Sequence, residues 1–465
     1  MKNYKRQIKQ CVKVMLGFLP GSMQEPLEAF ARKLLNGYRA FKAPIYPKKE
    51  EERCVDLMFE FLTKARLEIS KIDSSLHPRI QPQPYEYCPN LRESAIGKKF
   101  ITACKELDRG YDIIYVVPWL RSGGADLYCV NAANIMAAKG MSVLVITTEN
   151  SDSTWSSKLQ SNIRIYELGK CLKTFAFCEQ TEFFARLLVQ IKTKRVHIIN
   201  SHLALEATSV YKKYLQKNTE IYVSFFSNDI LDNGGEVGYI NSYLTVLDDA
   251  VVSYSTDNKL TPLYYEKKYG VNANRWSVVY NYIEKLSEEF RPHLGAKVLW
   301  AGRLDKHKRP ELLLEIIKRM PEVQFEIYGT SVLNDVPVSI LKEIKEQNNS
   351  VLRGSYDGFS SIPLEQFGCL LFTSTNEGLP NILIEAALAG LPIVGSNVGG
   401  VGDLLSETTG FPISGDTDAY IEAIRYVLNN KETAKLKARN AYELASARHS
   451  KNNMTKGLLH LYKTF

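Results

Sequence analysis

The stretch from Cys369 to Asp403, CLLFTSTNEGLPNILIEAALAGLPIVGSNVGGVGD, decides how the rest of the chain is interpreted. A short apolar run ends at Thr373, and Gly378 and Pro380 then interrupt the pattern. Apolar residues at helical spacing continue to Ala389, where a glycine and a proline stop them. This order predicts a strand, a turn, a helix and a second strand.

The start of this predicted helix has the chemistry of an anion site. Pro380 fits the first helical turn, so the free N–H groups of Asn381, Ile382 and Leu383 should point out of the helix start. Two carboxylates lie beside it, Glu377 before the helix and Glu385 inside it. Carboxylates accept hydrogen bonds from sugar hydroxyls, so phosphate and polyol together suggest a nucleotide sugar. The alternative is an ordinary βαβ unit with solvated glutamates.

A second stretch, KVLWAGRLDKHKRPELLLEII from Lys297 to Ile317, predicts another strand, loop and helix. Gly302 lets the chain turn, and Arg303 and Lys308 lie five residues apart in the loop. A planar guanidinium and a point charge suit a diphosphate. The alternative is a basic run exposed to solvent.

Both stretches resemble a known family. EGLPNILIEAALAGLPIV, with Glu377 and Glu385 eight apart around a Gly-x-Pro turn, resembles the signature of the retaining glycosyltransferases of family 4, which have the GT-B fold. GRLDKHK resembles the Gly-Arg-Leu-x-x-x-Lys motif of the same family, whose Arg and Lys bind the donor diphosphate. The resemblance covers residues 113 to 465 and implies that Arg303 and Lys308 do this here.

The resemblance also implies the remaining roles. Glu385 should accept from ribose hydroxyls and Glu377 from sugar hydroxyls, and the family reacts without a metal, the departing phosphate taking the acceptor proton. Arg303, Lys308 and Glu377 are therefore the expected catalytic residues. The expected donor-binding residues are Gly123, Gly124, Gly302, Arg353, Tyr356, Gly378, Leu379, Pro380, Asn381 and Glu385.

An earlier series of strands and helices starts at Ile113. Gly123 and Gly124 form a turn between its first strand and a helix from about Asp126, and glycines let a ligand approach the backbone. The family usually has Glu in place of Asp126. It also carries a histidine after the strand that matches residues 221–226, and this chain has none there, so Asn228 and Asp229 are the polar candidates for that position.

His202 follows another predicted strand end, where ligand sites of α/β proteins gather. It is therefore a possible contact for the acceptor or the sugar, and a structural histidine is the alternative.

These patterns predict an α/β chain with two doubly wound, Rossmann-like domains and a mainly helical N-terminal extension. The expected divisions are a helical basic extension at 1–108, an acceptor-side domain at 109–285, a nucleotide-sugar domain at 286–440, and a C-terminal helix at 441–465 that crosses back to the first domain.

Residues 1–49 hold eleven Lys and Arg against two Glu, a charge of +9 in a chain of +8. This favours an anionic partner there, either a membrane surface or other assembly proteins, and not general nucleic-acid binding. Packing on the catalytic body is the alternative for this segment.

Composition limits the other possibilities. No apolar run approaches the roughly 18 residues that span a bilayer, so a cytoplasmic protein, peripheral at most, is expected. The eight cysteines form no C-x-x-C pair and the seven histidines no ligand-spaced cluster, so reduced thiols and no metal site are expected. Asp416 and Asp418 precede a helical pattern and are expected to cap it.

The sequence thus predicts a retaining hexosyltransferase that uses a nucleotide diphosphate sugar and no cofactor, acting on a glycan that is lipid-linked, as in bacterial surface-polysaccharide assembly. A sugar-nucleotide epimerase of the same fold and a non-catalytic scaffold remain open.

Overall fold

The computed structural model describes residues 67–68, 71–72, 94–107, 110–230, 235–331 and 335–463. The chain divides into two compact units, Met1–Gln83 and Pro84–Phe465, and the account below concerns the second. The basic segment 1–49 and the helices expected before residue 67 lie outside the described residues. Within the described part, no helix is long and apolar enough to cross a membrane.

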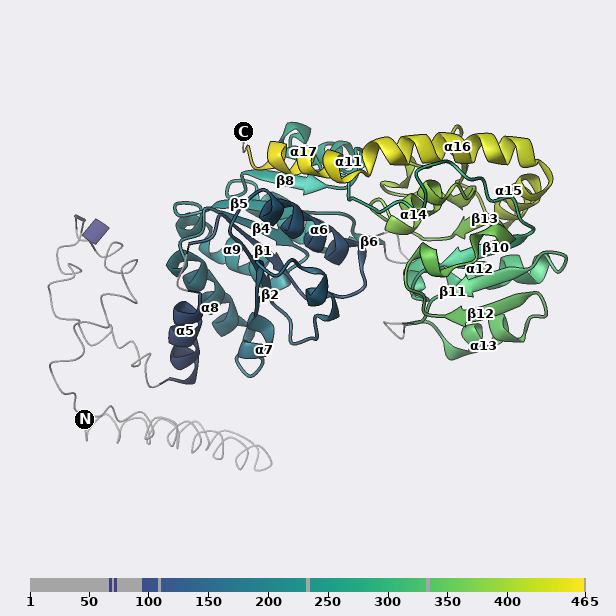
Figure 1. Ribbon diagram of the computed structural model, residues 1–465. Helices are drawn as coiled ribbons and strands as arrows, with labels where there is room; N and C mark the ends of the chain where they lie inside the picture. Colours follow the sequence, from purple (N-terminus) through teal and green to yellow (C-terminus); the bar gives the residue numbers. More distant parts are fainter. Residues whose placement is uncertain are drawn as a thin grey trace, which may run out of the picture. The chain divides into compact units, whose positions relative to one another are not determined.

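The first half of this unit is a parallel sheet, called here the N-terminal sheet (Figure 1). Its order is β3-β2-β1-β4-β5-β8-β9. Its strands are β1 Ile113–Val117, β2 Val143–Thr147, β3 Arg164–Glu167, β4 Arg195–Ile199, β5 Glu220–Ser224, β8 Ser253–Thr256 and β9 Trp276–Val278. A small hairpin, β6 Asp229–Ile230 and β7 Glu236–Val237, follows β5.

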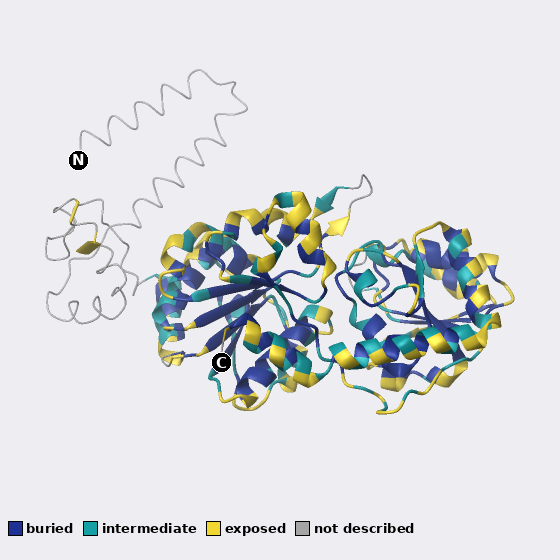
Figure 2. Cartoon of the chain, turned by 90° about the horizontal axis from the view of Figure 1, so that it is seen from above, coloured by how far each residue is buried: buried dark blue, intermediate teal, exposed yellow. Residues whose placement is uncertain are grey.

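The helices around this sheet are α5 Ala95–Glu106, α6 Gly124–Ala138, α7 Leu168–Leu172, α8 Phe177–Gln190, α9 His202–Leu215, α10 Tyr239–Leu247 and α11 Leu260–Tyr269. Every residue of β1, β2 and β4 is buried (Figure 2). Continuous apolar runs of this kind are typical of parallel strands covered by helices on both faces.

The second half contains the C-terminal sheet, ordered β12-β11-β10-β13-β14-β15. Its strands are β10 Lys297–Ala301, β11 Phe325–Tyr328, β12 Ser350–Gly354, β13 Phe367–Phe372, β14 Ile393–Ser396 and β15 Phe411–Ile413. Its helices are α12 Pro310–Arg319, α13 Val338–Glu346, α14 Asn381–Ala389, α15 Thr417–Asn429 and α16 Lys431–Arg448. The predicted fold class, two Rossmann-like domains with parallel sheets, is confirmed.

The last helix, α17 Lys451–Leu461, packs against α6 and β9 of the first half, whereas α16 packs against α14 and α15. Asp403 adds contacts between the halves, because its carboxylate accepts from the Lys259 N–H at 2.9 Å and from the Tyr280 hydroxyl at 2.8 Å. Within its own half it also accepts from Arg448 at 3.1 Å. The chain therefore connects its two sheets by packing and by hydrogen bonds.

The helix after β13 differs in detail from its prediction. Pro380 is the residue before the helix and not part of its first turn, because its ψ of 132° is extended. The Leu383 N–H donates to the Pro380 carbonyl at 3.0 Å, so this donor is used inside the helix. Of the three N–H groups expected to be free at this helix start, that of Leu383 is therefore not free.

Candidate functional site

Lys308 and Glu377 form the centre of the candidate site. Lys308 follows β10 and Glu377 follows β13, two neighbouring strands, and the Lys308 ammonium donates to the Glu377 carboxylate. The His307 ring lies 3.8 Å from the same oxygen. Burial raises the pKa of Glu377, but the charge and hydrogen bond of Lys308 outweigh it, so its pKa is below the ordinary value. Glu377 is thus held ionised next to a fixed cation.

Arg303 is positioned by the turn at Gly302. Gly302 has a φ of +150°, and its carbonyl lies only 1.7 Å from where a side chain on Gly329 would begin, so the two loops approach closely. The Arg303 Nε lies 3.1 Å from the carboxylate of Asp305, which is fully buried. The guanidinium remains 48% exposed, so it can still donate to a ligand.

The starts of two helices, one from each sheet, meet beside these residues. Gly124 begins α6 and Asn381 begins α14, and a side chain on Gly124 would start 3.6 Å from the Asn381 Nδ2. Near Gly123, the Asp126 carboxylate accepts from the Arg121 N–H at 3.1 Å. Burial raises the pKa of Asp126 to about 7, against the opposing N–H bond and charge of Arg121 and the smaller effect of the Arg303 charge. The glycine turn, Arg303 and the start of α14 therefore lie together. Both helix starts favour a bound anion.

A chain of asparagines fixes the direction of the Asn381 amide. The Asn281 Nδ2 donates to the Asn381 Oδ1 at 3.2 Å, and the Asn131 Nδ2 donates to the Asn281 Oδ1 at 3.0 Å. The Asn281 carbonyl lies 2.9 Å from the His449 Nδ1. Because its oxygen is occupied, Asn381 presents its amide N–H groups to the glycine turn. Sequence reasoning missed Asn131 and Asn281.

Gly378 and Leu379 hold the turn against the N-terminal sheet. The Leu379 N–H donates to the Asp257 carboxylate at 3.1 Å. A side chain on Gly378 would begin 2.9 Å from the same carboxylate and 3.0 Å from the Phe226 carbonyl. Burial raises the pKa of Asp257 to about 7. The carboxyl ends of the two sheets thus meet at this turn, and only glycine fits there. Sequence reasoning missed Asp257 too.

Glu385 lies about one turn inside α14, which begins at Asn381. Burial raises the pKa of Glu385 to about 7. The pKa of the Tyr356 phenol is also raised, mainly by its own burial and in addition by the charge of Glu385. In the part of the chain that the structure describes, the Glu385 carboxylate makes no hydrogen bond or ion pair. Arg353 does not reach this pair, because its guanidinium bonds to Glu326 on β11 at 2.9 Å. A ligand would supply the missing donors of Glu385.

The three remaining candidates, His202, Asn228 and Asp229, lie in the N-terminal half. His202 begins α9, where it is exposed and stacked on Phe177. Asn228 is buried, its amide donates to the Tyr265 hydroxyl at 2.9 Å, and its carbonyl accepts from Asn376 at 2.6 Å. Asp229 is exposed on β6. Asn228 is therefore a structural link to the loop that carries Glu377.

No group of His, Cys, Asp or Glu side chains among the described residues could hold a metal ion. The capping prediction is confirmed for Asp416, whose carboxylate accepts from the N–H groups of Asp418 and Ala419 at the start of α15. Asp418 lies inside the first turn of α15 and pairs with Arg319 instead.

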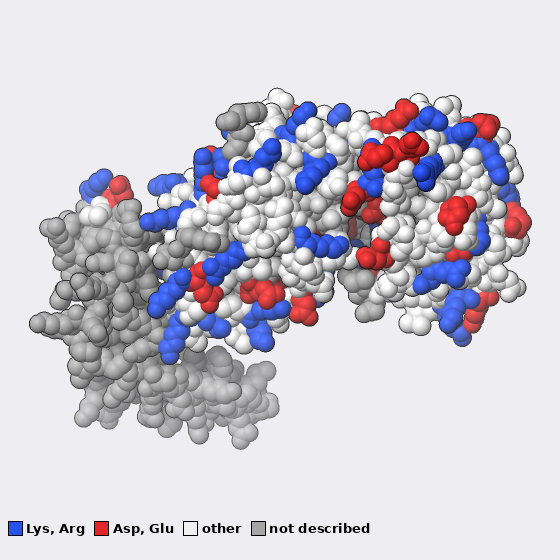
Figure 3. Space-filling view, viewed as in Figure 1, with Lys and Arg blue, Asp and Glu red and all other residues white. Residues whose placement is uncertain are grey.

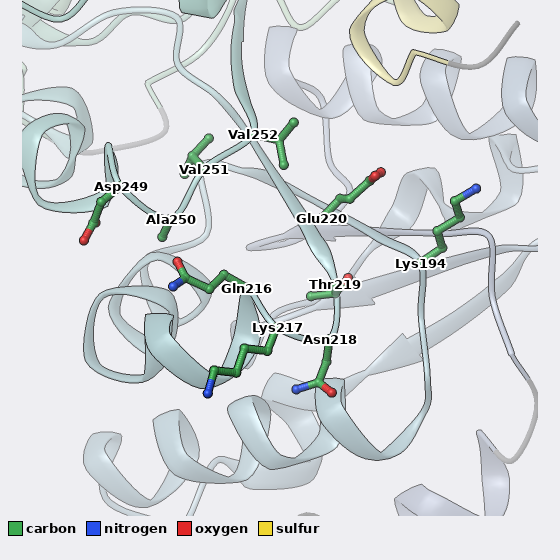
Figure 4. A pocket seen from close by; sticks show the side chains of 10 residues that line it. All are labelled: Lys194, Gln216, Lys217, Asn218, Thr219, Glu220, Asp249, Ala250, Val251 and Val252. Atoms are coloured by element: carbon green, nitrogen blue, oxygen red, sulfur yellow. The ribbon is translucent and has the colours of Figure 1, made fainter.

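A surface hollow of about 720 Å³ lies elsewhere (Figure 4). Its lining includes Lys194 and Glu220 at the amino ends of β4 and β5. Ligands of open α/β sheets bind at the carboxyl ends of strands. The hollow is therefore at the wrong edge to be the site described above.

Two parallel sheets of this topology, joined at the carboxyl ends of their strands, define the GT-B class of proteins. Residues 295–430 match the family described as "Glycosyl transferases group 1". The "O-antigen biosynthesis glycosyltransferase WbnH" of Escherichia coli is 25% identical over 303 residues, which cover 63% of this chain and 82% of that protein. An "Uncharacterized 41.2 kDa protein in cps region" of Klebsiella pneumoniae is 28% identical over 245 residues, covering 47% of this chain and 64% of that one.

Among solved structures, the Anabaena protein Alr3699/HepE in complex with UDP-glucose superposes with a TM-score of 0.61 at 15% identity, covering 76% of this chain and 100% of that one. A glycosyltransferase from Rickettsia africae gives 0.60 at 16% identity, with coverages of 77% and 100%. Likeness at this identity shows the fold. The fold and the sequence matches together support a GT-B glycosyltransferase.

Proposed function

We propose that this chain transfers a hexose from a nucleotide diphosphate sugar to a glycan acceptor, with retention of the anomeric configuration and without a metal. The bond between the sugar C1 and the β-phosphate oxygen breaks, and a bond from the acceptor oxygen to C1 forms on the same face. The acceptor proton passes to the departing phosphate oxygen. The products are the extended glycan and the nucleoside diphosphate.

One observation carries this proposal: the starts of α6 and α14 meet at Gly124 and Asn381, next to the Lys308–Glu377 pair. A diphosphate bound there would contact helix-end N–H groups and two cations, Arg303 and Lys308. Fixed donors of this kind stabilise the charge that develops on a leaving phosphate. The carboxylates Glu377 and Glu385 would accept from the hydroxyls of the sugar and the ribose.

The acceptor proposal rests on relatives. WbnH is described as acting in O-antigen biosynthesis, and we extend this to a lipid-linked glycan at the inner face of the membrane. The basic segment 1–49 would make the membrane contact. Lysine and arginine are mixed with acidic residues over the face shown in Figure 3, so this face offers less for that contact.

The test begins with a thermal-shift screen of nucleotide sugars, followed by transfer assays on the one that binds. Lys308→Ala should reduce turnover by about 10²–10³-fold, the usual cost of one such donor. Because that variant leaves Glu377 buried without its cation, the double variant Lys308→Ala/Glu377→Gln is needed beside it, and it should be equally slow. Lys318→Ala is the control, since Lys318 pairs with Glu343 on the surface.

Four results would each contradict part of the proposal. Binding of no nucleotide sugar would remove the donor, and near-normal turnover of Lys308→Ala would remove its role. Inversion at C1 by NMR, or loss of activity in a chelator that metal restores, would overturn the mechanism.

A further inference from the structure

Three helices of the N-terminal half each begin with an aromatic ring, and the three rings are stacked. Phe177 begins α8, His202 begins α9 and Tyr239 begins α10. The Phe177 and His202 centroids lie 4.8 Å apart at 21°, and those of His202 and Tyr239 lie 6.0 Å apart at 20°. Rings from three separate helices are thus nearly parallel, which helix packing alone does not require.

This aromatic stack lies at the ligand edge of its sheet. His202 follows the end of β4, and β4 is paired with β1. The glycine turn at Gly123 and Gly124 follows the end of β1. Thr148, after β2, donates to the carbonyl of Val117 at the end of β1 and lies 2.8 Å from the Ser201 hydroxyl. Neighbouring strands are about 5 Å apart. The stack therefore lies at the same edge of the N-terminal sheet as the glycine turn, after the strand next to it.

A second connection reaches the stack from the other sheet. Tyr239 follows directly after the hairpin β6–β7, which begins next to Asn228. The Asn228 carbonyl accepts from Asn376, the residue before Glu377. The loop that carries the proposed sugar-binding carboxylate is thus joined to the segment that leads into the stack.

The surface chemistry of the stack is amphipathic. Phe177 is 42% exposed and His202 is exposed, so ring surface is left to a ligand. Glu206 lies one turn after His202 on α9, where it accepts from the Tyr243 hydroxyl at 2.8 Å and keeps a second oxygen. The pKa of the Tyr239 phenol is raised mainly by burial and in addition by the charge of Glu149, which is therefore nearby. The two carboxylates disfavour an anionic ligand and favour one that donates through hydroxyl groups.

We propose that Phe177, His202 and Tyr239, with Glu206 and Glu149, form a binding site for a neutral pyranose residue of the acceptor. This rests on the proposed transferase function and names the acceptor class of its site. The C–H face of a pyranose is apolar and would be buried on an aromatic ring, while its equatorial hydroxyls would donate to the carboxylates. The acceptor is then recognised as a sugar, and not by a phosphate or a peptide group.

The test measures binding of acceptor sugars separately from donor binding. Methyl pyranosides of glucose, galactose, mannose, N-acetylglucosamine and N-acetylgalactosamine are titrated by ligand-observed NMR against the full chain, with UDP or GDP present. At least one should bind, and both Phe177→Ala and His202→Ala should weaken it about tenfold or more. Tyr214→Ala is the matched control, because Tyr214 is an exposed aromatic residue in the last turn of α9, at the other end of that helix.

Nucleoside diphosphate affinity should be the same in all four proteins, so a failure here is distinct from a failure of the donor site. In transfer assays the two stack variants should raise the acceptor KM more than they lower kcat. The proposal is overturned if no pyranoside binds the unmodified chain, or if the two stack variants bind it as tightly as Tyr214→Ala does. Equal loss of nucleotide binding and pyranoside binding would show that the rings only support the helix starts.

Discussion

Replacing Glu385 by glutamine should remove a pH dependence from nucleotide-sugar binding. Burial raises the pKa of this carboxyl from 4.5 to about 7. If ribose hydroxyls donate to it, the ligand binds the ionised form. That form grows from about one tenth of the molecules at pH 6 to about nine tenths at pH 8, so affinity should rise about tenfold. Glutamine cannot ionise, so the part of this slope that comes from Glu385 should disappear in the variant.

The size of the loss at pH 8 follows from the hydrogen bond itself. A bond to a charged acceptor contributes about 1.5–3 kcal/mol and a neutral one about 0.5–1.5. Glu385→Gln should therefore weaken binding by about tenfold at pH 8 and have little effect at pH 6. A nucleotide sugar is the right ligand, because its diphosphate has no proton to lose in this range and leaves the protein as the source of the slope.

Stability should change in the opposite direction. The folded-state pKa of Glu385 is raised, so its contribution to stability is fully present below about pH 4.5 and is lost as the pH rises through about 7. A rise of about 2.5 in pKa corresponds to a loss of about 3 kcal/mol in the free energy of unfolding, and partial exposure of the carboxyl reduces this loss to about 2 kcal/mol. The unliganded Glu385→Gln protein should thus be more stable than the unmodified chain at pH 8, and similar to it at pH 4.

Calorimetric titrations at pH 6, 7 and 8 and urea unfolding at pH 4 and 8 measure both effects. Glu311→Gln is the control, because Glu311 is an exposed glutamate in the first turn of α12. The reasoning is refuted if the affinity of the unmodified chain is constant from pH 6 to 8. It is also refuted if Glu385→Gln keeps the same slope.

Three other changes test the geometry of the site. Asn281→Ala should raise the donor KM about tenfold with a smaller change in kcat, because Asn381 loses the partner that orients its amide, and an unchanged KM would end that role. Gly378→Ala should lower stability by about 1–3 kcal/mol, since its side chain would begin 2.9 Å from the Asp257 carboxylate, and denaturant unfolding checks this against Gly110→Ala, where the nearest atom would lie at an ordinary contact distance of 3.8 Å. Arg303→Lys should keep part of the activity lost in Arg303→Ala, because lysine retains the charge without the planar fork, and equal activity of both variants would contradict a charge role.

Much of the site was open to prediction because it follows local rules. Central parallel strands are apolar throughout, so runs such as IIYVV and FGCLL mark their own positions, and polar or glycine residues after them mark the ligand edge. The meeting of Gly124 and Asn381 follows from topology, since each begins a helix at the carboxyl end of a sheet. The edge strands β3 and β15 were missed because they are short and only half-buried, which leaves no continuous apolar run.

Other parts of the site could not be predicted, because they depend on contacts between residues far apart in the sequence. Leu379 and Asp257 are separated by 122 residues, and Asn281 and Asn381 by 100. Asp257 follows a strand with the composition of an ordinary turn, and nothing local distinguishes it. The one available signal was its position directly after β8, at the carboxyl edge of the sheet. The same kind of position was used to select His202.

The Lys308–Glu377 pair suggests how the site is held ready before a donor arrives. Both side chains are largely buried, at 14% and 17% exposure, and a buried carboxylate without a cation would be protonated or would move toward water. The pair keeps Glu377 ionised and Lys308 fixed in the absence of ligand. A bound donor offers each a second partner, phosphate for the ammonium and sugar hydroxyls for the carboxylate, so neither group must be desolvated at that moment. Because the cost of burying both charges is met when the protein folds, the stabilisation of the departing phosphate requires little reorganisation.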